Sequence, residues 1–200
     1  MRPLTDEELT LVFEKLKKYI GSNIKHLIEE SDSDGPRVFR MIKKKVYLLT
    51  ESMVKMCSAI AKEHILHAGV CLGQFSKTGK FRLGITALGV IAKYSSTKVW
   101  LKTSGEQNFL YGNHVLKAHI ARVSENALKY TGVVVMTLSN VPLGFGVMAK
   151  SSQEFKEADP SAIYVFNQAD VGEYLRIESD RHTKLKDDEE DDEIEKVALN

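Results

Sequence analysis

The sequence predicts an α+β protein of two domains: a small α/β domain with a largely antiparallel sheet and flanking helices, followed by a pseudo-barrel of short strands. In the first half, helix and strand patterns interleave without a regular period. In the second half, many short strand patterns with frequent turn signals surround one brief helix pattern. A connection rich in small residues at 89–97 separates the two. We therefore expect domains at 1–94 and 95–177, and a charged tail at 178–200.

The first domain opens on a helix signal. Thr5-Asp6-Glu7-Glu8 is a capping-box pattern, because the Thr5 hydroxyl can accept from the Glu8 amide while the Glu8 carboxylate accepts from the Thr5 amide. An apolar stripe continues to Ile20, and Gly21 suits the helix end. The further elements that we expect are a strand at 24–28, a loop at 31–36, strands at 37–42 and 46–50, a helix from Thr50 or Ser52 to about Lys62, one or two strands within 65–75, and a strand at 81–88.

Two connections in this domain are basic. Lys43-Lys44-Lys45 joins two predicted strands, and Lys77-Thr78-Gly79-Lys80 has the pattern of a tight hairpin turn. The first lysine run is either a phosphate contact or a solvated turn, and its position between two strands favours the turn.

In the second domain we expect strands at 99–102, 109–111, 133–138, 143–149, 163–166 and 173–177, and a short helix at 114–122. The strand at 143–149 alternates an apolar face with a face that carries Gly144 and Gly146. A strand face without side chains lets another backbone or a nucleic-acid chain come close. The alternative is a bend of the barrel that only needs small residues, and the pattern alone favours the bend.

Composition limits the classes of protein that fit. The chain has 200 residues, of which 43% are hydrophobic, so it can bury one good core or two small ones. No stretch approaches the roughly 18 apolar residues of a membrane span. The N-terminus lacks the apolar core of a signal peptide. Two cysteines, Cys57 and Cys71, are too few for a disulfide framework, which indicates a reducing, intracellular compartment and no membrane association.

The formal charge of +1 hides an uneven distribution. Residues 187–200 hold eight acidic residues and one lysine, so the rest of the chain carries +8. Residues 1–94 hold 16 Lys and Arg against 10 Asp and Glu, whereas 95–176 hold eight against seven. A basic body is typical of a chain that meets a polyanion. The acidic tail is either part of a protein that binds a polyanion or a solvated end that keeps the protein soluble.

No pattern predicts catalysis, a metal or a cofactor. Residues 73–80, GQFSKTGK, miss the phosphate-loop spacing, and Phe81 stands where a Mg²⁺-binding hydroxyl is needed. His64 and His67 lack a third ligand nearby in the sequence, so we interpret them as structural. Cys57 belongs to an apolar helix stripe with Met53, Met56 and Ile60, which we expect to face inward.

Binding is the remaining interpretation. Two cations follow residues 109–113, and two more follow the strand at 143–149 that carries the glycines. If the barrel brings these two segments together, the four cations flank a groove whose floor is formed by the two glycines. The candidate RNA-binding residues are Lys117, Arg122, Lys150, Lys156, Gly144 and Gly146. Tyr111 is either a platform on which a base stacks or a core aromatic, and the core is the commoner use of such a residue.

Long motifs then resemble a known family. They are MRPLTDEE at the start, FLYGNHVLK at 109–117, VPLGFGVMAKS at 141–151 and FNQADVGEYLR at 166–176. Residues 1–177 resemble the eukaryotic large-subunit (pre-60S) ribosome-biogenesis factors with a C-terminal PUA domain, the NIP7 family. The resemblance implies a mixed five-stranded N-terminal domain followed by a mixed-β PUA pseudo-barrel, which is an RNA-binding module.

The resemblance also implies a function: a non-enzymatic, RNA-binding assembly factor of pre-60S particles in the nucleus and nucleolus, needed for pre-ribosomal RNA processing and 60S subunit biogenesis. Its partners would be pre-ribosomal RNA and other pre-60S assembly factors, with the chain a monomer within the larger particle. The family's basic positions carry over to Lys150 and Lys156, while 151–154 depart from the family pattern. Two alternatives remain: a protein adaptor or scaffold with only weak RNA contact, and an RNA-modifying enzyme with an accessory PUA domain.

Overall fold

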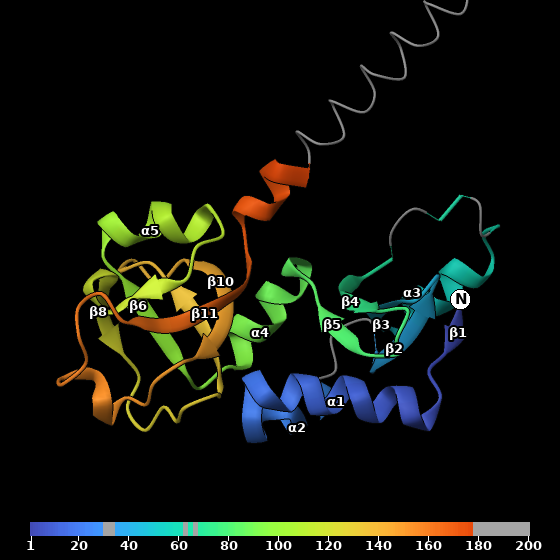
Figure 1. Cartoon of the computed structure of the whole chain (residues 1–200). Coiled ribbons are helices and arrows are strands. Elements are labelled where there is room, and N and C mark those ends of the chain that lie inside the picture. The colour runs from blue at the N-terminus through green and yellow to red at the C-terminus, as the bar shows by residue number, and fades with distance from the viewer. Residues whose placement is uncertain (30–34, 62–63, 66–67, 178–200) are drawn as a thin grey trace, which may run out of the picture.

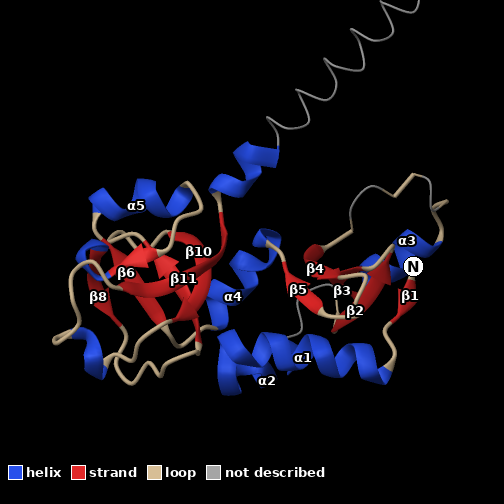
Figure 2. Ribbon diagram, in the orientation of Figure 1, coloured by secondary structure: helices blue, strands red, loops and turns tan. Residues whose placement is uncertain are grey.

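The structure, a computed structural model, describes residues 1–29, 35–61, 64–65 and 68–177. It contains two β-sheets, one formed from each half of the chain (Figure 1). Helix α1 (Asp6–Ile20) contacts strand β5 (Phe81–Leu83) of the first sheet and β9 (Gly132–Met136) of the second. Helix α4 (Leu88–Tyr94) packs against β10 (Pro142–Met148). Figure 2 shows the same arrangement, with these helices at the junction of the two halves. None of the described helices is both long and apolar enough to cross a membrane.

The first sheet has five strands in sequence order. They are β1 (Arg2–Pro3), β2 (Arg37–Ile42), β3 (Lys45–Thr50), β4 (Val70–Phe75) and β5 (Phe81–Leu83). Every pairing is antiparallel, which confirms the antiparallel sheet. The number of strands agrees with the family resemblance, whereas the mixed pairing that it implied for this domain is wrong.

The lysine run forms a solvated hairpin turn, as predicted. Ile42 and Lys45 are partners in the ladder, so only Lys43 and Lys44 lie between the strands. Their φ angles are +48° and +69°, the left-handed values that a type I′ turn requires at both central positions. Both side chains are exposed.

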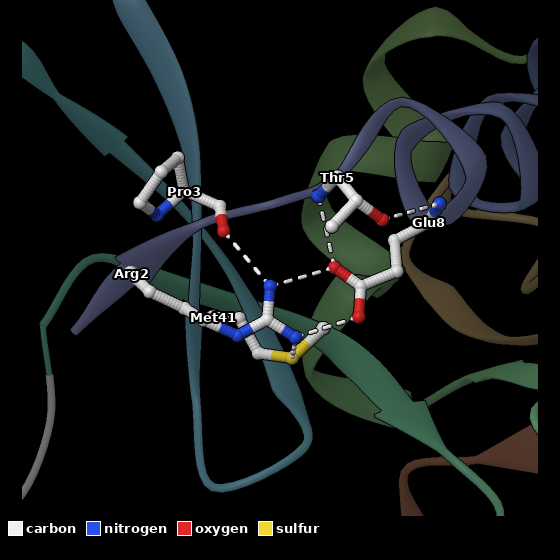
Figure 3. A network of polar contacts seen from close by, with 5 residues as sticks. All are labelled: Arg2, Pro3, Thr5, Glu8 and Met41. Atoms are coloured by element: carbon white, nitrogen blue, oxygen red, sulfur yellow. Dashed lines mark hydrogen bonds and ion pairs between the residues drawn. The ribbon is translucent and has the colours of Figure 1, made fainter.

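The capping box at the start of α1 is confirmed, and it also holds β1 (Figure 3). The Thr5 hydroxyl accepts from the Glu8 amide at 3.3 Å, and the Glu8 carboxylate accepts from the Thr5 amide at 2.9 Å. Arg2 donates to both Glu8 oxygens at 2.6 and 2.8 Å, and its guanidinium also contacts Met41 of β2. The bond from Arg2, followed by that from Thr5, lowers the pKa of Glu8 to about 2. The first motif therefore fastens strand, helix and sheet together.

Helices replace two of the elements expected in the first half. The strand expected at 24–28 is helix α2 (Ile24–Glu29), because a 3₁₀ turn at Gly21–Asn23 carries the chain on in a helical conformation. The strand expected at 81–88 ends at Leu83. A 3₁₀ turn, Ile85–Ala87, takes the place of the rest of this strand, and helix α4 occupies most of the expected connection at 89–97.

The second expected helix is α3 (Glu51–Ser58), and it is shorter than predicted. Thr50 caps it, with its hydroxyl accepting from the amide of Met53. Met53 and Cys57 pack inward, whereas Met56 and Ile60 are 59% and 50% exposed, so the inward placement of these two is wrong. Residues 31–34 of the expected loop, Lys62 and His67 lie outside the described residues.

The second sheet has six strands in the order β7-β11-β10-β9-β6-β8 and curls into a nearly closed pseudo-barrel. They are β6 (Lys98–Leu101), β7 (Val115–Leu116), β8 (Ile120–Val123), β9 (Gly132–Met136), β10 (Pro142–Met148) and β11 (Ile163–Asp170). β6 runs parallel to β9 and the other pairs are antiparallel, so the sheet is mixed. The strands expected at 99–102, 133–138, 143–149 and 163–166 are confirmed.

Three assignments in this half are wrong. Residues 109–111 end helix α5 (Thr103–Leu110), from which Phe109 is buried in the barrel. The helix expected at 114–122 is two strands joined by a 3₁₀ turn, Lys117–His119. Residues 172–177 are helical rather than extended.

One continuous core joins the two halves. Val12, Leu16 and Tyr19 of α1 belong to the same buried cluster as Val134 and Phe145 of the barrel. The rings of Tyr19 and Phe145 meet edge to face with their centroids 5.3 Å apart. The interior of the barrel is a second cluster that includes Phe109 and Tyr164. This shared core fixes the position of the first sheet relative to the barrel.

Candidate nucleic-acid interface

Three of the predicted lysines gather around the loop that follows β10. Lys150 begins this loop and Lys156 lies within it. Lys117 reaches it from the 3₁₀ turn after β7, where its ammonium donates to the carbonyl of Lys156 at 3.2 Å and to that of Ala158. The fold thus brings the Lys117 side chain onto the loop that carries Lys150 and Lys156. Because Lys117 is held by two carbonyls, its ammonium first serves to fix the loop.

A fourth lysine, Lys129, joins this group. The positive charges of Lys129 and Lys150 both act on Glu154, whose pKa is lowered chiefly by hydrogen bonds from Ser151. Lys117 and Lys150 likewise act on Asp159, whose pKa is lowered first by its bonds from Ser161. We call Lys117, Lys129, Lys150 and Lys156 the lysine cluster. Sequence reasoning missed Lys129, because only the folded chain brings its loop beside the loop that follows β10.

Backbone and ring contacts fix the loop that carries the cluster. The Ser152 amide donates to the Ala127 carbonyl at 2.8 Å, and the Tyr164 hydroxyl donates to the Ser151 carbonyl at 2.5 Å. The rings of Phe155 and Tyr164 stack edge to face, with centroids 5.2 Å apart. The lysine side chains therefore project from a supported backbone, which lowers the entropic cost of binding a ligand.

The cluster carries only a small net charge. The loop after β10 also carries three acidic residues, Glu154, Glu157 and Asp159, which together with the four lysines leave a charge of +1. This agrees with the near-neutral charge counted along the whole of residues 95–176. The surface can contact phosphates, but it does not form a strong positive field.

Arg122 lies apart from these lysines, on β8. Its guanidinium stacks over the ring of Trp100 on the neighbouring strand, 3.7 Å from the ring centroid. The indole N–H of Trp100 donates to Asn140 at 2.8 Å. Both Arg122 and Tyr111 are exposed, and Tyr111, at 69% exposure, is not a core aromatic.

The glycine face of β10 does not floor a groove. A Cβ added to Gly144 would lie 2.3 Å from the Ala169 carbonyl, and one added to Gly146 would lie 2.3 Å from the Phe166 carbonyl. Both glycines are buried against β11. The expectation that Gly144 and Gly146 line an RNA groove is therefore corrected: the missing side chains let the backbone of β11, rather than a nucleic-acid chain, come close.

The two motifs at 109–117 and 166–176 hold each other. Asp170, 2% exposed, accepts from Asn167 and forms an ion pair with Arg176 at 3.0 Å. Arg176 also donates to the Leu110 carbonyl at 2.6 Å. Gly172 is required beneath this contact, because a Cβ there would lie 2.1 Å from the same carbonyl. These motif residues fasten the helical segment 172–177 to the end of α5, so they support the fold rather than form an exposed site.

Within the described ranges, no group of three or more His, Cys, Asp or Glu side chains is arranged to hold a metal ion. Cys57 is a free, half-buried cysteine on the apolar side of α3, as expected.

Two family models match the chain. The model for the NIP7/UPF0113 pre-PUA domain matches residues 1–85, and the model for the UPF0113 PUA domain matches residues 97–179. A 60S ribosome subunit biogenesis protein NIP7 homolog from Xenopus laevis is 53% identical over 178 residues, which cover 89% of this chain and 98% of the relative. The chain belongs to the NIP7 family. Two yeast members of the family, from Schizosaccharomyces pombe and Saccharomyces cerevisiae, are 51% and 49% identical over the same 89% of this chain and 98% and 97% of their own.

Solved structures agree with the fold. A PUA-domain protein from Aeropyrum pernix K1 superposes with a TM-score of 0.52 at 14% identity, covering 86% of this chain and 85% of that one. A conserved PUA-domain protein from Thermoplasma acidophilum gives 0.51 at 11% identity, covering 86% and 93%. The α+β fold with a C-terminal PUA pseudo-barrel is thereby confirmed for this member of the NIP7 family.

Proposed function

We propose that this NIP7-family chain is an RNA-binding, non-catalytic assembly factor that takes part in pre-ribosomal RNA processing and biogenesis of the large (60S) ribosomal subunit. The observation that carries the proposal is the match of 178 residues at 53% identity to a relative named for 60S subunit biogenesis. The family models match residues 1–85 and 97–179, so both domains take part in the similarity.

In this proposal the lysine cluster contacts RNA phosphates from the supported loop after β10, and no covalent bond is made or broken. A cluster with a net charge of +1 positions RNA more than it attracts it. The more basic half, residues 1–94 with 16 cationic side chains against 10 acidic, would supply the remaining attraction. Arg122, which stacks on Trp100, would contact RNA separately from the cluster.

Crosslinking in cells followed by sequencing of the attached RNA tests this function. We expect the reads to concentrate on large-subunit pre-ribosomal RNA and to decrease for a Lys150→Ala/Lys156→Ala chain expressed at the same level. Reads that scatter over unrelated RNAs, or do not exceed those of a mock sample, would contradict the proposal.

A protein adaptor within pre-60S particles is the second candidate. It is favoured by the small net charge of the barrel and by exposed apolar side chains, among them Leu175 at 72% and Tyr174 at 48% exposure. If the other assembly factors remain bound to the tagged chain after RNase treatment, the adaptor role is supported. Their complete loss would remove it.

The proposal also places the chain in the nucleus and nucleolus, as a monomer within a larger particle and with pre-60S assembly factors as partners. Fluorescent tagging and sedimentation of cell extract on a gradient would test this. We expect nucleolar signal and co-migration with pre-60S particles, and a purely cytoplasmic signal would contradict it.

A further inference from the structure

A polar pocket lies where α1 meets both sheets. Its volume is about 350 Å³, and its walls are Lys15, Tyr19, Arg82, Leu83, Phe145 and Gln168. The polar side chains therefore come from three separate elements: α1, β5 and β11. The volume is near the lower end of the roughly 300–1,000 Å³ that is typical of small-ligand sites. The pocket has room for a small charged group with some of its hydration.

Two cations line this pocket without a carboxylate to balance them. Lys15 is half-buried and Arg82 is exposed, and the salt bridges recorded among the described residues lie elsewhere. Burial lowers the pKa of Lys15, and the neighbouring charges of Lys18 and Arg82 lower it further. An anion between Lys15 and Arg82 would offset this repulsion.

Tyr19 closes the pocket on its buried side. It is only 2% exposed, and within the described part of the chain its buried hydroxyl oxygen has no hydrogen-bond partner. A ligand in the pocket therefore contacts the edge of Tyr19 and not its hydroxyl, so the polar contacts come from Lys15, Arg82 and Gln168.

We propose that this pocket binds a phosphate group, with Lys15, Arg82 and the Gln168 amide as donors. The donors come from three elements, and a phosphate carries oxygens around its whole surface, so it can accept from all of them. A planar carboxylate accepts only from two sides. Because the pocket is shared between the sheets, a bound phosphate would also strengthen the junction between the two domains.

The phosphate has two sources, a phosphate of an RNA chain or a small free phosphate. The RNA source rests on the proposed function, whereas the site itself does not. Titrating inorganic phosphate into the full chain, with chloride lowered to keep ionic strength constant, tests the site alone. Amide signals in ¹H–¹⁵N NMR spectra report where the anion binds.

We expect saturable shifts at Tyr19, Arg82 and Gln168. Arg82→Ala should weaken phosphate binding at least about tenfold, because it removes a charged donor. Lys15→Ala should also weaken it, because it removes the second charged donor. Lys17→Ala is the matched control, since it removes one exposed cation from α1 without touching the pocket. Shifts that do not saturate, or that Arg82→Ala and Lys17→Ala reduce equally, would overturn the site.

A single-stranded RNA oligonucleotide then identifies the source. If RNA displaces inorganic phosphate, and Arg82→Ala weakens RNA binding, the site takes an RNA phosphate. If RNA binds without displacing phosphate, the site takes a small phosphate. If the chain binds no RNA at all while phosphate still binds at Tyr19 and Gln168, the proposed function fails and the phosphate site stands.

Discussion

Gly146→Ala separates a packing role of the glycine face from a role in RNA binding. The added methyl group would lie 2.3 Å from the Phe166 carbonyl oxygen and 2.8 Å from a methyl carbon of Val165. The carbonyl belongs to β11, the strand that pairs with β10, so it cannot move away without disturbing the ladder. Overpacking of this kind costs about 1–3 kcal/mol, and contact with the backbone places this substitution near 3 kcal/mol.

The loss is measured by thermal unfolding followed through the fluorescence of Trp100, the only tryptophan in the sequence. Each kcal/mol corresponds to a decrease in Tm of roughly 2–4 °C for a chain of this size, so we expect a decrease of about 6–12 °C. Gly89→Ala is the matched control. It lies in helix α4 with open space around the added carbon, and it should stabilise the chain by about 0.5–1 kcal/mol.

The folded fraction of Gly146→Ala should bind RNA as the unsubstituted chain does. An unchanged unfolding midpoint combined with lost RNA affinity would refute the packing argument and restore the glycine-floored groove.

Three further predictions concern the buried ion pair, the capping box and the tail. Asp170→Ala should destabilise the chain by about 3 kcal/mol, which is the low end for breaking a buried pair because Arg176 is itself 44% exposed. It should also increase proteolytic cleavage after Arg176, and unchanged cleavage would contradict the fastening role. Because the pKa of Glu8 is lowered in the folded chain, its pairing with Arg2 stabilises the fold above the ordinary carboxyl pKa of about 4.5, and this stabilisation is lost as the pH falls toward about 2. Glu8→Gln should therefore reduce the loss of stability between pH 5 and 2, which unfolding curves across that range would measure, and an unaltered pH profile would argue against it. Removal of residues 187–200 changes the formal charge from +1 to +8. Filter binding should then show a higher RNA affinity, with a larger increase at low salt than at high salt. Equal affinity of the full and shortened chains at low salt would mean that the tail does not repel the RNA.

Local signals predicted the elements that local interactions specify. The Thr5 and Glu8 bonds of the capping box need only neighbouring residues, and the two-residue turn at Lys43 and Lys44 depends on the strands that flank it. Both were predicted correctly.

Tertiary packing determines the elements that sequence reasoning missed. Helix α5 has no side-chain cap and contains Gly105, which packs so closely on His119 that an added Cβ would lie 2.5 Å from the His119 Cβ. Its apolar end, Phe109 to Tyr111, has the residue types of a strand. The helical segment 172–177 likewise depends on the contact between Arg176 and a distant carbonyl.

The candidate site was predicted in part, for the same reason. The motifs indicated Lys150 and Lys156, but alternation along β10 does not reveal how closely its neighbour β11 packs against the glycines, and the glycine face was therefore misassigned. Lys129 and the pocket at Tyr19 depend on loops and elements that meet only in the folded chain.

The salt dependence of RNA binding tests the central claim, that this chain holds RNA through the lysine cluster. For single-stranded RNA, each lost phosphate contact reduces the slope of log affinity against log salt by about 0.7. We predict that Lys150→Ala/Lys156→Ala makes the slope shallower by about 1.4 and weakens binding, whereas the charge-preserving Lys150→Arg/Lys156→Arg leaves both unchanged. A flat dependence for the unsubstituted chain, or an identical slope for the alanine variant, would contradict the claim.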